Sequence, residues 1–312
     1  MTLGKIKPKL RLDFSDFGCI NKVDNWFTNI LQREFTVEIN DRPDLLIFQE
    51  GGHLNRLYTC RKLFWTGESI MPDWRKTDYA MTCHYLDDSR NLRFPYYVWG
   101  SECTPIELIK GPDYVENVFN KKNKFCSTVF SNGNKRRAGA RIDFFLKLNN
   151  KKTIDSGGRF MNNIGGSLPI GGRPKRAFNE AYKFHMCFEN KEMDGYTTEK
   201  IVDAMWAQCI PIYWGNRRVS EEFNTKSMLC RYDYSSDDDF INRILEVDND
   251  DDLYRSILKE PFFHNNKPNE FYSEDRILEF LIKVIEDKTS PISHKRKFWH
   301  PGRWKLAKRM HL

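Results

Sequence analysis

The spacing of apolar and polar residues along the chain predicts many short strands separated by helices, and it is clearest over residues 182–215. Apolar residues alternate with polar ones over 184–188, which is the period of an extended strand. A helix is predicted to start near Thr197 or Thr198, because either hydroxyl could cap it. Residues 210–214 form a nearly continuous apolar run and predict a second, buried strand.

The rest of the chain follows the same pattern. Its other predicted strands are 10–14, 36–39, 44–48, 62–65, 79–85, 125–130, 152–155 and 227–230, and its predicted helices are about 22–33, 141–148, 240–245, 251–258 and 273–286. Strands that alternate with helices favour an α/β fold. A segment rich in proline and charge precedes Asn120, which places a domain boundary there. We therefore expect an α/β domain over residues 1–120, a second over 121–288 and a tail over 289–312.

The polar residues of 182–215 gather where the first strand ends and the helix begins. A strand, helix and strand of this kind place the helix N-terminus at the carboxyl edge of a parallel sheet, where phosphates are commonly bound. A lysine in the first turn opposes the helix dipole, so Lys200 is better explained as the neutraliser of a bound diphosphate. Glu199 could accept hydrogen bonds from ribose hydroxyls. An ordinary capped surface helix is the alternative.

Composition narrows the class of protein. The chain has 312 residues, of which 40% are hydrophobic and 30% charged, as expected for a folded globular protein. Its net charge is +7, and the seven Lys and Arg after residue 292 account for it: without them 43 bases balance 43 acids. A balanced body gives little support to nucleic-acid binding.

Other sequence signals concern the cellular compartment. No run of about 18 apolar residues predicts a transmembrane helix. The basic N-terminus has no apolar segment before Asp13, so we do not interpret it as a signal peptide. The eight cysteines are scattered, with no CxxC pair, which is typical of reduced, buried thiols. We therefore expect a cytoplasmic protein.

Several motifs together resemble one family. FEN (188–190), GYTTEK (195–200) and IPIYWG (210–215) are similar to the donor-site stretch of the α1,3/4-fucosyltransferases, the bacterial members especially. The likeness extends to the other motifs in the same order, which are FWTGES (64–69), PDW, DYAM, RFPYY (93–97), FCSTVFSN (125–132) and DSGGR (155–159). The resemblance covers roughly residues 44–285.

The resemblance implies two Rossmann-like domains facing across a cleft, which is the GT-B type. It also implies an inverting transfer of fucose from GDP-fucose to the 3-hydroxyl of GlcNAc in N-acetyllactosamine-type glycans, giving a Lewis-type product. By resemblance the catalytic base is Glu68, although a solvated loop glutamate is the alternative. Acceptor selectivity is expected in two loops of the first domain, Gln49 to Asn55 and Ser69 to Lys76.

The resemblance also implies donor-binding residues. Lys200 and Arg159 would stabilise the departing diphosphate, although some bacterial relatives carry the arginine two positions later, where this chain has Met161. The remaining residues carried over to the donor site are Glu199, Asn190, Tyr196, Ser131, Asn132, Glu189 and Lys183. Other readings stay open: transfer in a different linkage or to a different acceptor, or a nucleotide-sugar or glycan-binding protein that has lost catalysis.

We expect no tightly bound cofactor and no metal site. Asp237 to Asp239 and Asp248 to Asp250 both match DxD, but they precede predicted helices, where acids cap the N-terminus. A divalent metal would not be required for donor binding, although it could stimulate transfer. We interpret His185 as a packed strand residue. The tail over 293–312 mixes basic and aromatic residues, so it could bind an anionic membrane surface or be a solubilising end.

Overall fold

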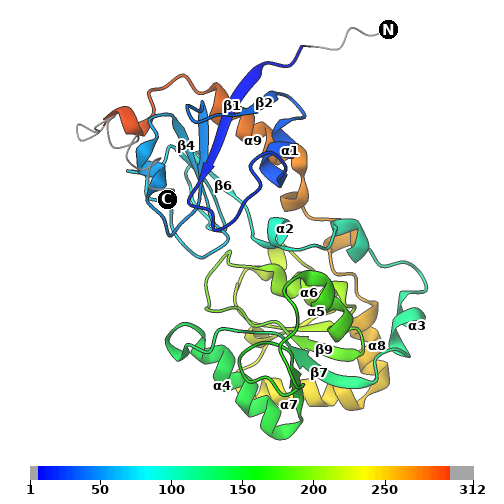
Figure 1. Ribbon diagram of the computed structural model, residues 1–312. Helices are drawn as coiled ribbons and strands as arrows, with labels where there is room; N and C mark the ends of the chain where they lie inside the picture. Colours follow the sequence, from blue (N-terminus) through cyan, green and yellow to red (C-terminus); the bar gives the residue numbers. More distant parts are fainter. Residues whose placement is uncertain (1–5, 296–312) are drawn as a thin grey trace. The chain divides into compact units, whose positions relative to one another are not determined.

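The chain folds into two compact α/β units in the computed structural model, which describes residues 6–295 (Figure 1). The first unit comprises the chain up to Phe94 and again from Ser273, and the second comprises Pro95–Tyr272. The two units divide after Phe94 rather than near Asn120, where the sequence predicts a boundary. Residues after Pro95 belong to the second unit because Tyr97, Cys103 and Leu108 are buried in its core.

The helix predicted over 273–286 forms, but in the first unit rather than in the second domain as predicted. The strands of the first unit are β1 (Lys9–Ser15), β2 (Thr36–Ile39), β3 (Leu45–Phe48), β4 (Arg61–Trp65), β5 (Tyr79–Thr82) and β6 (Asn91–Arg93). Its helices and 3-10 turns are α1 (Trp26–Leu31), α9 (Glu274–Glu286), η1 (Leu54–Leu57) and η8 (Ile292–Lys295). All its described strand pairs are parallel, in the order β2-β1-β3-β4-β5-β6.

The two faces of the first sheet are covered differently. Helix α9 packs against α1 and β4 (Figure 1). The rings of Phe280 and Tyr79 lie 6.0 Å apart. On the opposite face a small apolar cluster contains Phe48 and Phe64, packed against Tyr58 and Trp74 from the connecting segments. Loops and the short turn η1 border that cluster, which leaves room for a pocket.

The second unit has a parallel sheet in the order β11-β10-β9-β7-β8. Its strands are β7 (Lys124–Thr128), β8 (Ile154–Ser156), β9 (Tyr182–Met186), β10 (Ile210–Tyr213) and β11 (Leu229–Cys230). Its helices are α2 (Tyr97–Gly100), α3 (Tyr114–Phe119), α4 (Lys135–Lys151), α5 (Gly172–Asn179), α6 (Glu199–Trp206), α7 (Asp237–Asn249) and α8 (Asp251–Lys259). Its 3-10 turns are η2 (Pro105–Leu108), η3 (Val219–Glu221), η4 (Thr225–Ser227), η5 (Arg231–Asp233), η6 (His264–Asn266) and η7 (Glu270–Tyr272).

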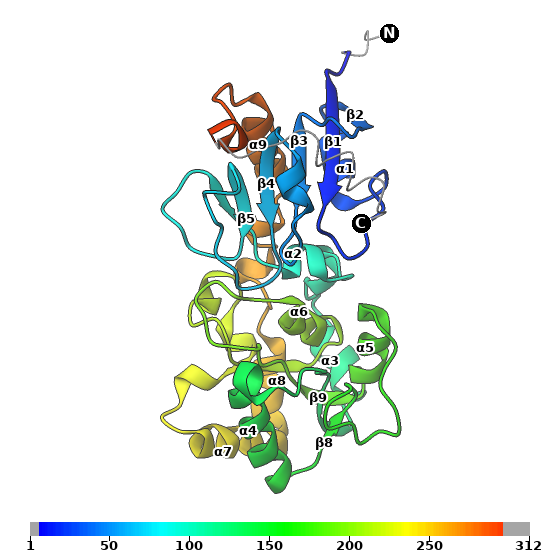
Figure 2. The same cartoon turned by 60° about the vertical axis from the view of Figure 1, so that its left-hand side comes forward.

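Helices cover both faces of the second sheet. Figures 1 and 2 show α5 and α6 on one side of β7 and β9, with α4 and α7 on the other. The larger core cluster joins α4, α7 and α8 to the sheet, and a second cluster joins α6 to α2. A sheet that is buried on both faces requires apolar residues at nearly every position, which explains the continuous run over 210–213.

In each sheet there is a topological switch point, at which successive strands of the chain are added on opposite sides of one strand. In the first sheet β1 lies between β2 and β3, and in the second β7 lies between β8 and β9. Ligands of open parallel sheets bind outside the carboxyl ends of the strands at such switch points. The segments that follow β7 and β9 are therefore the first place to look for a site in the second unit.

Most predicted elements form, although some of their ends differ. Helix α1 covers only Trp26–Leu31 of the predicted 22–33, because Asn25 caps it by accepting from Phe27 N and Thr28 N. Helix α4 extends well beyond the predicted 141–148. Thr198 is the N-cap residue of α6, but its hydroxyl makes no capping bond.

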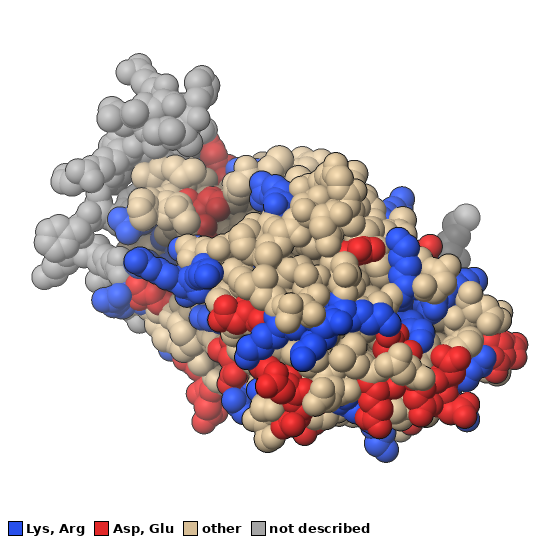
Figure 3. All heavy atoms as spheres, turned by 90° about the horizontal axis from the view of Figure 1, so that it is seen from below, with Lys and Arg blue, Asp and Glu red and all other residues tan. Residues whose placement is uncertain are grey.

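No helix within residues 6–295 is long and apolar enough to span a bilayer. The predicted membrane contact of 293–312 falls almost wholly outside the described residues and stays a prediction. On the face drawn in Figure 3, basic side chains form a row with acidic side chains on both sides of it. That mixed pattern agrees with the balanced charge of the body.

His185 lies in β9 with 4% of its surface exposed and its Nδ1 atom 2.9 Å from Ser127 Oγ. Burial lowers its pKa to about 3, and the charge of Lys175 adds to the effect. In the unfolded chain this imidazole is protonated below about pH 6.5, whereas in the folded chain it stays neutral down to about pH 3. The unfolding free energy should therefore decrease as the pH falls from 6.5 to 3, by up to about 1.4 kcal/mol per pH unit.

Urea unfolding at pH 7.5, 6.0 and 5.0 measures this slope, and His185→Gln should flatten it. Identical pH dependence in the two proteins would show that His185 does not stay neutral in the fold.

Candidate active site

The centre of the candidate site is a buried carboxylate, Glu189, which follows β9 and has no exposed surface. Its Oε1 accepts from Thr198 N at 2.7 Å, and its Oε2 accepts from Thr198 Oγ1 at 2.9 Å and Lys200 Nζ at 3.0 Å. Gly215 leaves room for it, since a Cβ there would lie 2.4 Å from Glu189 Cγ. The final glycine of IPIYWG is thus required for packing.

The charges around Glu189 compensate one another. Burial raises its pKa and Lys200 lowers it, with a net rise. Burial alone would lower the pKa of Lys200, but Glu189 and Glu199 raise it above its usual range. Burial would likewise raise the pKa of Glu199, but Lys200 and Lys175 lower it on balance. The site therefore keeps Lys200 as a cation.

A second layer of charges lies along the same helix. Lys175 Nζ is 2.8 Å from Asp203 Oδ2 and 3.9 Å from Glu199 Oε1. Burial raises the pKa of Asp203 to about 6 despite that lysine. Glu199 and Lys200 are therefore members of a partly buried network, and the interpretation as an ordinary solvated cap does not describe them.

Arg141 is a site residue that the sequence reasoning missed. It lies in α4 and is 2% exposed. Its Nη1 donates to Asn190 Oδ1 at 2.8 Å and its Nη2 donates to Asn132 O at 3.1 Å. Its Nε is buried and has no hydrogen-bond partner. Arg141 thus connects the segments after β7 and β9 across the switch point, and it retains an unused donor.

The signal for Arg141 was present in the sequence. Together with Phe145 and Leu148 it occupies positions i, i+4 and i+7, which is the apolar stripe of the predicted helix. A charged residue on such a stripe is rarely buried without a specific partner. The sequence prediction includes Arg141 only as the first residue of that helix.

Arg159 differs from Arg141 in its exposure and in its hydrogen bonds. Its side chain is exposed, and its backbone N–H donates to Ser131 Oγ at 3.4 Å. The loop after β8 lies close to β7 because Gly158 has no Cβ, which would otherwise lie 2.0 Å from Phe130 O. Gly158 of DSGGR thus allows contact with the backbone of the segment that follows β7. Of the two arginines, the geometry favours Arg141 as the residue that faces the switch point.

Two other predicted donor residues have contrasting positions. Tyr196 is 2% exposed and lies in the segment between β9 and α6, close in sequence to Thr198, so the structure places it beside the site. Lys183 is not brought there. It lies near the amino end of β9, roughly 20 Å from Glu189 along the extended chain, and its Nζ donates to Asp248 O at 2.7 Å. Lys183 therefore anchors α7, and the structure does not bring it together with the other predicted donor residues.

Glu68 belongs to the first unit, in the exposed loop after β4. Its backbone N–H donates to Thr66 Oγ1 at 2.9 Å, and its carbonyl accepts from Ile70 N at 2.8 Å. These bonds fix the backbone of the loop at the carboxyl edge of the first sheet. The role of Glu68 as the base stays a prediction, and the structure places the residue in the loop that follows β4.

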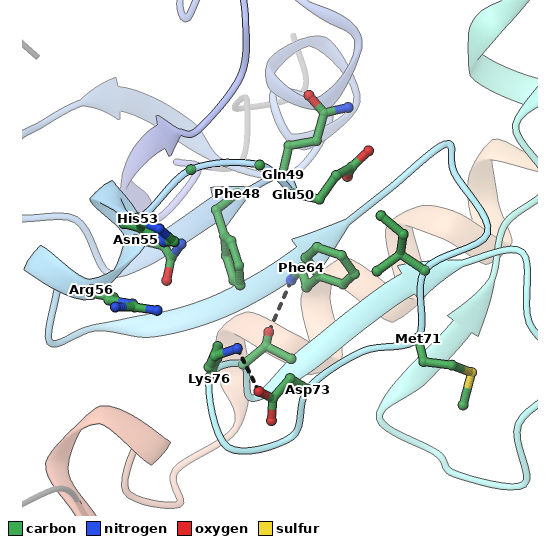
Figure 4. Close-up of a pocket in the computed structure, with 14 residues that line it drawn as sticks. Phe48, Gln49, Glu50, His53, Asn55, Arg56, Phe64, Met71, Asp73 and Lys76 are labelled. Carbon is green, nitrogen blue, oxygen red and sulfur yellow. Dashed lines mark hydrogen bonds and ion pairs between the residues drawn. The ribbon is translucent and has the colours of Figure 1, made fainter. Parts of the chain in front are cut away.

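The first unit also contains a pocket of about 310 Å³ (Figure 4). Phe48 and Phe64 lie at its base, and two loops surround it, from Gln49 to Arg56 and from Ile70 to Thr77. These are nearly the two loops that were predicted to carry acceptor selectivity. The carboxylate of Asp16 holds the first loop by accepting from Leu54 N at 2.8 Å and Asn55 N at 2.9 Å.

The acidic motifs are structural. Asp237 to Asp239 form the first turn of α7, which Ser236 caps. Asp250 caps α8, whereas Asp248 is buried and pairs with Lys152 and Lys183, so it is not the solvated cap that was predicted. Over residues 6–295, His, Cys, Asp and Glu form no group of three or more that could bind a metal ion.

Solved structures of other proteins resemble this fold. A crystal structure of an α1,3-fucosyltransferase with GDP-fucose superposes with a TM-score of 0.73 at 27% identity, covering 93% of this chain and 94% of that one. A second structure, of an α1,3-fucosyltransferase, gives a TM-score of 0.71 at 26% identity over 92% of each chain. The two parallel α/β units are thus those of a GT-B type glycosyltransferase.

The sequence places the chain more narrowly. The model for the C-terminal part of glycosyltransferase family 10 (fucosyltransferase) matches residues 119–284, and that for the α-(1,3)-fucosyltransferase FucT N-terminal domain matches residues 12–99. The chain belongs to glycosyltransferase family 10. It is 27% identical over 301 residues to α-(1,3)-fucosyltransferase FucT of Helicobacter pylori, which covers 83% of this chain and only 62% of that protein.

Glu189→Gln tests the central pair. The change leaves the ammonium of Lys200 without its carboxylate, and we expect the unfolding free energy to fall by about 2 kcal/mol, below the 3–5 of fully buried pairs, because the lysine keeps 18% exposure. Glu192→Gln is the control, since it breaks an exposed pair with Arg217 and should cost under about 1 kcal/mol. Equal urea midpoints for the two variants would contradict the role given to Glu189.

Proposed function

We propose that this chain is an inverting glycosyltransferase that moves L-fucose from GDP-fucose to the 3-hydroxyl of GlcNAc in N-acetyllactosamine-type glycans, giving a Lewis-type product. Membership of family 10 and the likeness to an α1,3-fucosyltransferase with GDP-fucose support the donor. The observation that carries the proposal is the cationic group at the switch point of the second sheet, where Arg141 and Lys200 gather.

The chemistry of transfer fits these residues. A base takes the proton of the acceptor hydroxyl, whose oxygen attacks C1 of fucose from the face opposite the diphosphate. The C1–O bond breaks, GDP leaves with the bonding electrons, and the β-linkage of the donor becomes α. In this proposal Glu68 is the base, and Lys200 with Arg141 neutralises the charge that develops on the diphosphate.

The remaining donor contacts follow from position. Glu199 would accept hydrogen bonds from the ribose, and Asn190, Tyr196, Ser131 and Asn132 would border the donor. Arg159 would contact it only from an exposed loop. Because two cations are available for the diphosphate, donor binding is proposed not to require a metal, although a divalent ion could stimulate transfer.

Other outcomes concern linkage and activity. The chain could use another acceptor or form another linkage, or it could bind a nucleotide sugar without catalysis. Incubation with GDP-fucose and a panel of oligosaccharides, followed by mass and linkage analysis, distinguishes these. A mass gain with α1,3 linkage to GlcNAc supports the proposal, and GDP-fucose binding without any product would reject it. We further propose a cytoplasmic location, with residues 293–312 at the inner face of the membrane.

Glu68→Ala and Lys200→Ala should both abolish transfer, for different reasons. The first variant lacks the base but should still bind GDP-fucose with nearly unchanged affinity, and the second should lose affinity for GDP. Turnover and calorimetric titration with GDP separate the two effects, and circular dichroism checks that each variant is folded. Turnover near that of the parent protein would remove the residue concerned from the mechanism.

A second pair of variants decides between the two candidate donor arginines. Arg141→Gln should raise the Kd for GDP about 10- to 100-fold, since hydrogen bonds to charged groups contribute about 1.5–3 kcal/mol. Arg159→Gln should change it less than about threefold, because that side chain is exposed. The opposite order of the two effects would return the role to Arg159.

A further inference from the structure

The pocket of the first unit has one end beside Glu68. Ile70 lines that end, and its N–H donates to the carbonyl of Glu68 at 2.8 Å. Phe48, at the base, is the last residue of β3, so the pocket begins at the carboxyl edge of the sheet. A ligand that extends from Glu68 along this face would therefore enter the pocket.

The base and one wall of the pocket suit a sugar. The rings of Phe48 and Phe64 have centroids 5.4 Å apart and provide an apolar surface for the face of a sugar ring. Glu50 lines the pocket, and its Oε2 is buried without a hydrogen-bond partner. A buried carboxylate oxygen requires a donor, and a sugar hydroxyl would supply one.

The other end of the pocket is basic. In Figure 4, His53 and Arg56 lie together on one side, away from Glu50 and Met71. Both are exposed, and neither side chain has an ion pair or hydrogen bond recorded within residues 6–295. Lys76 also lines the pocket but pairs with Asp73 at 2.7 Å, and Arg75 binds the same carboxylate. Arg56 is therefore the cation of this pocket that remains available.

A second pocket, of about 300 Å³ in the other unit, provides a contrast. It too is lined by aromatic and basic residues, but its cations are neutralised by its own acids. Arg217 pairs with Glu192, and both Arg231 and Lys147 pair with Asp237. The cations of this second pocket thus have acidic partners within the protein, whereas Arg56 of the first pocket has none among residues 6–295.

We propose that the first-unit pocket binds an acidic oligosaccharide acceptor, in which a carboxylate-bearing sugar lies one or two residues from the accepting hydroxyl. Arg56 forms the paired N–H bonds with that carboxylate that a guanidinium makes best, and His53 borders it. Glu50 accepts from a hydroxyl of the sugar that lies on Phe48 and Phe64. This inference rests on the proposed transferase function, since it names the acceptor class.

The test uses two acceptors that differ only in one uronic or sialic acid residue, with saturating GDP-fucose. The ratio of kcat/KM for the acidic over the neutral acceptor should be about 10 or more for the parent protein, by the magnitude of a charge-assisted hydrogen bond. Arg56→Gln should reduce that ratio about tenfold, and Arg56→Lys should reduce it less. Arg42→Gln, which alters an exposed arginine outside the pocket, should leave it unchanged.

Direct titration of both oligosaccharides into the full chain, without donor, keeps the inference testable apart from catalysis. Preferential binding of the acidic one that Arg56→Gln removes, with no transfer to either, would reject the proposed function and keep the pocket assignment. Transfer to both acceptors with equal efficiency, or a ratio unaffected by Arg56→Gln, would overturn the acidic specificity and leave a neutral glycan as the occupant.

Discussion

The burial of one charge, on Glu189, constrains the whole candidate site of the second unit. A carboxylate with no exposed surface requires hydrogen bonds and a counter-charge, and here the first turn of α6 supplies both. That requirement fixes the loop between β9 and α6, and it excludes any side chain at position 215. The motif FEN, the threonines before the helix and the glycine after the next strand are therefore parts of one arrangement.

Because the acids and bases of this arrangement compensate one another, the cations are held in place before any ligand arrives. Lys200 is positioned by Glu189 and Thr198, and Arg141 by the amide of Asn190 and a backbone carbonyl. A site whose cations are already oriented loses little conformational entropy when an anion binds. The unused Nε of Arg141 shows that its hydrogen-bonding capacity is not exhausted within the protein.

The order of strands and helices could be predicted because each buried strand is a short apolar run with polar residues at its carboxyl end. The family motifs likewise located Glu189, Asn190 and the start of α6. Two features of the site could not be predicted from such patterns. The role of Arg141 depends on a contact with Asn190, 49 positions away, and periodicity describes only local neighbours. The position of Lys183 at the amino end of β9 follows from counting along a strand, which a motif match does not do.

The return of α9 to the first unit makes the second unit an insertion in the first. The chain leaves the first unit after Phe94 and comes back to it at Ser273. During synthesis the sheet of the first unit therefore emerges long before the helix that covers it, while residues 95–272 can already form their own core. Until α9 has been synthesised, the face of the first sheet that α9 covers stays exposed to water. The solubility of the nascent amino-terminal segment therefore depends on the rest of the chain.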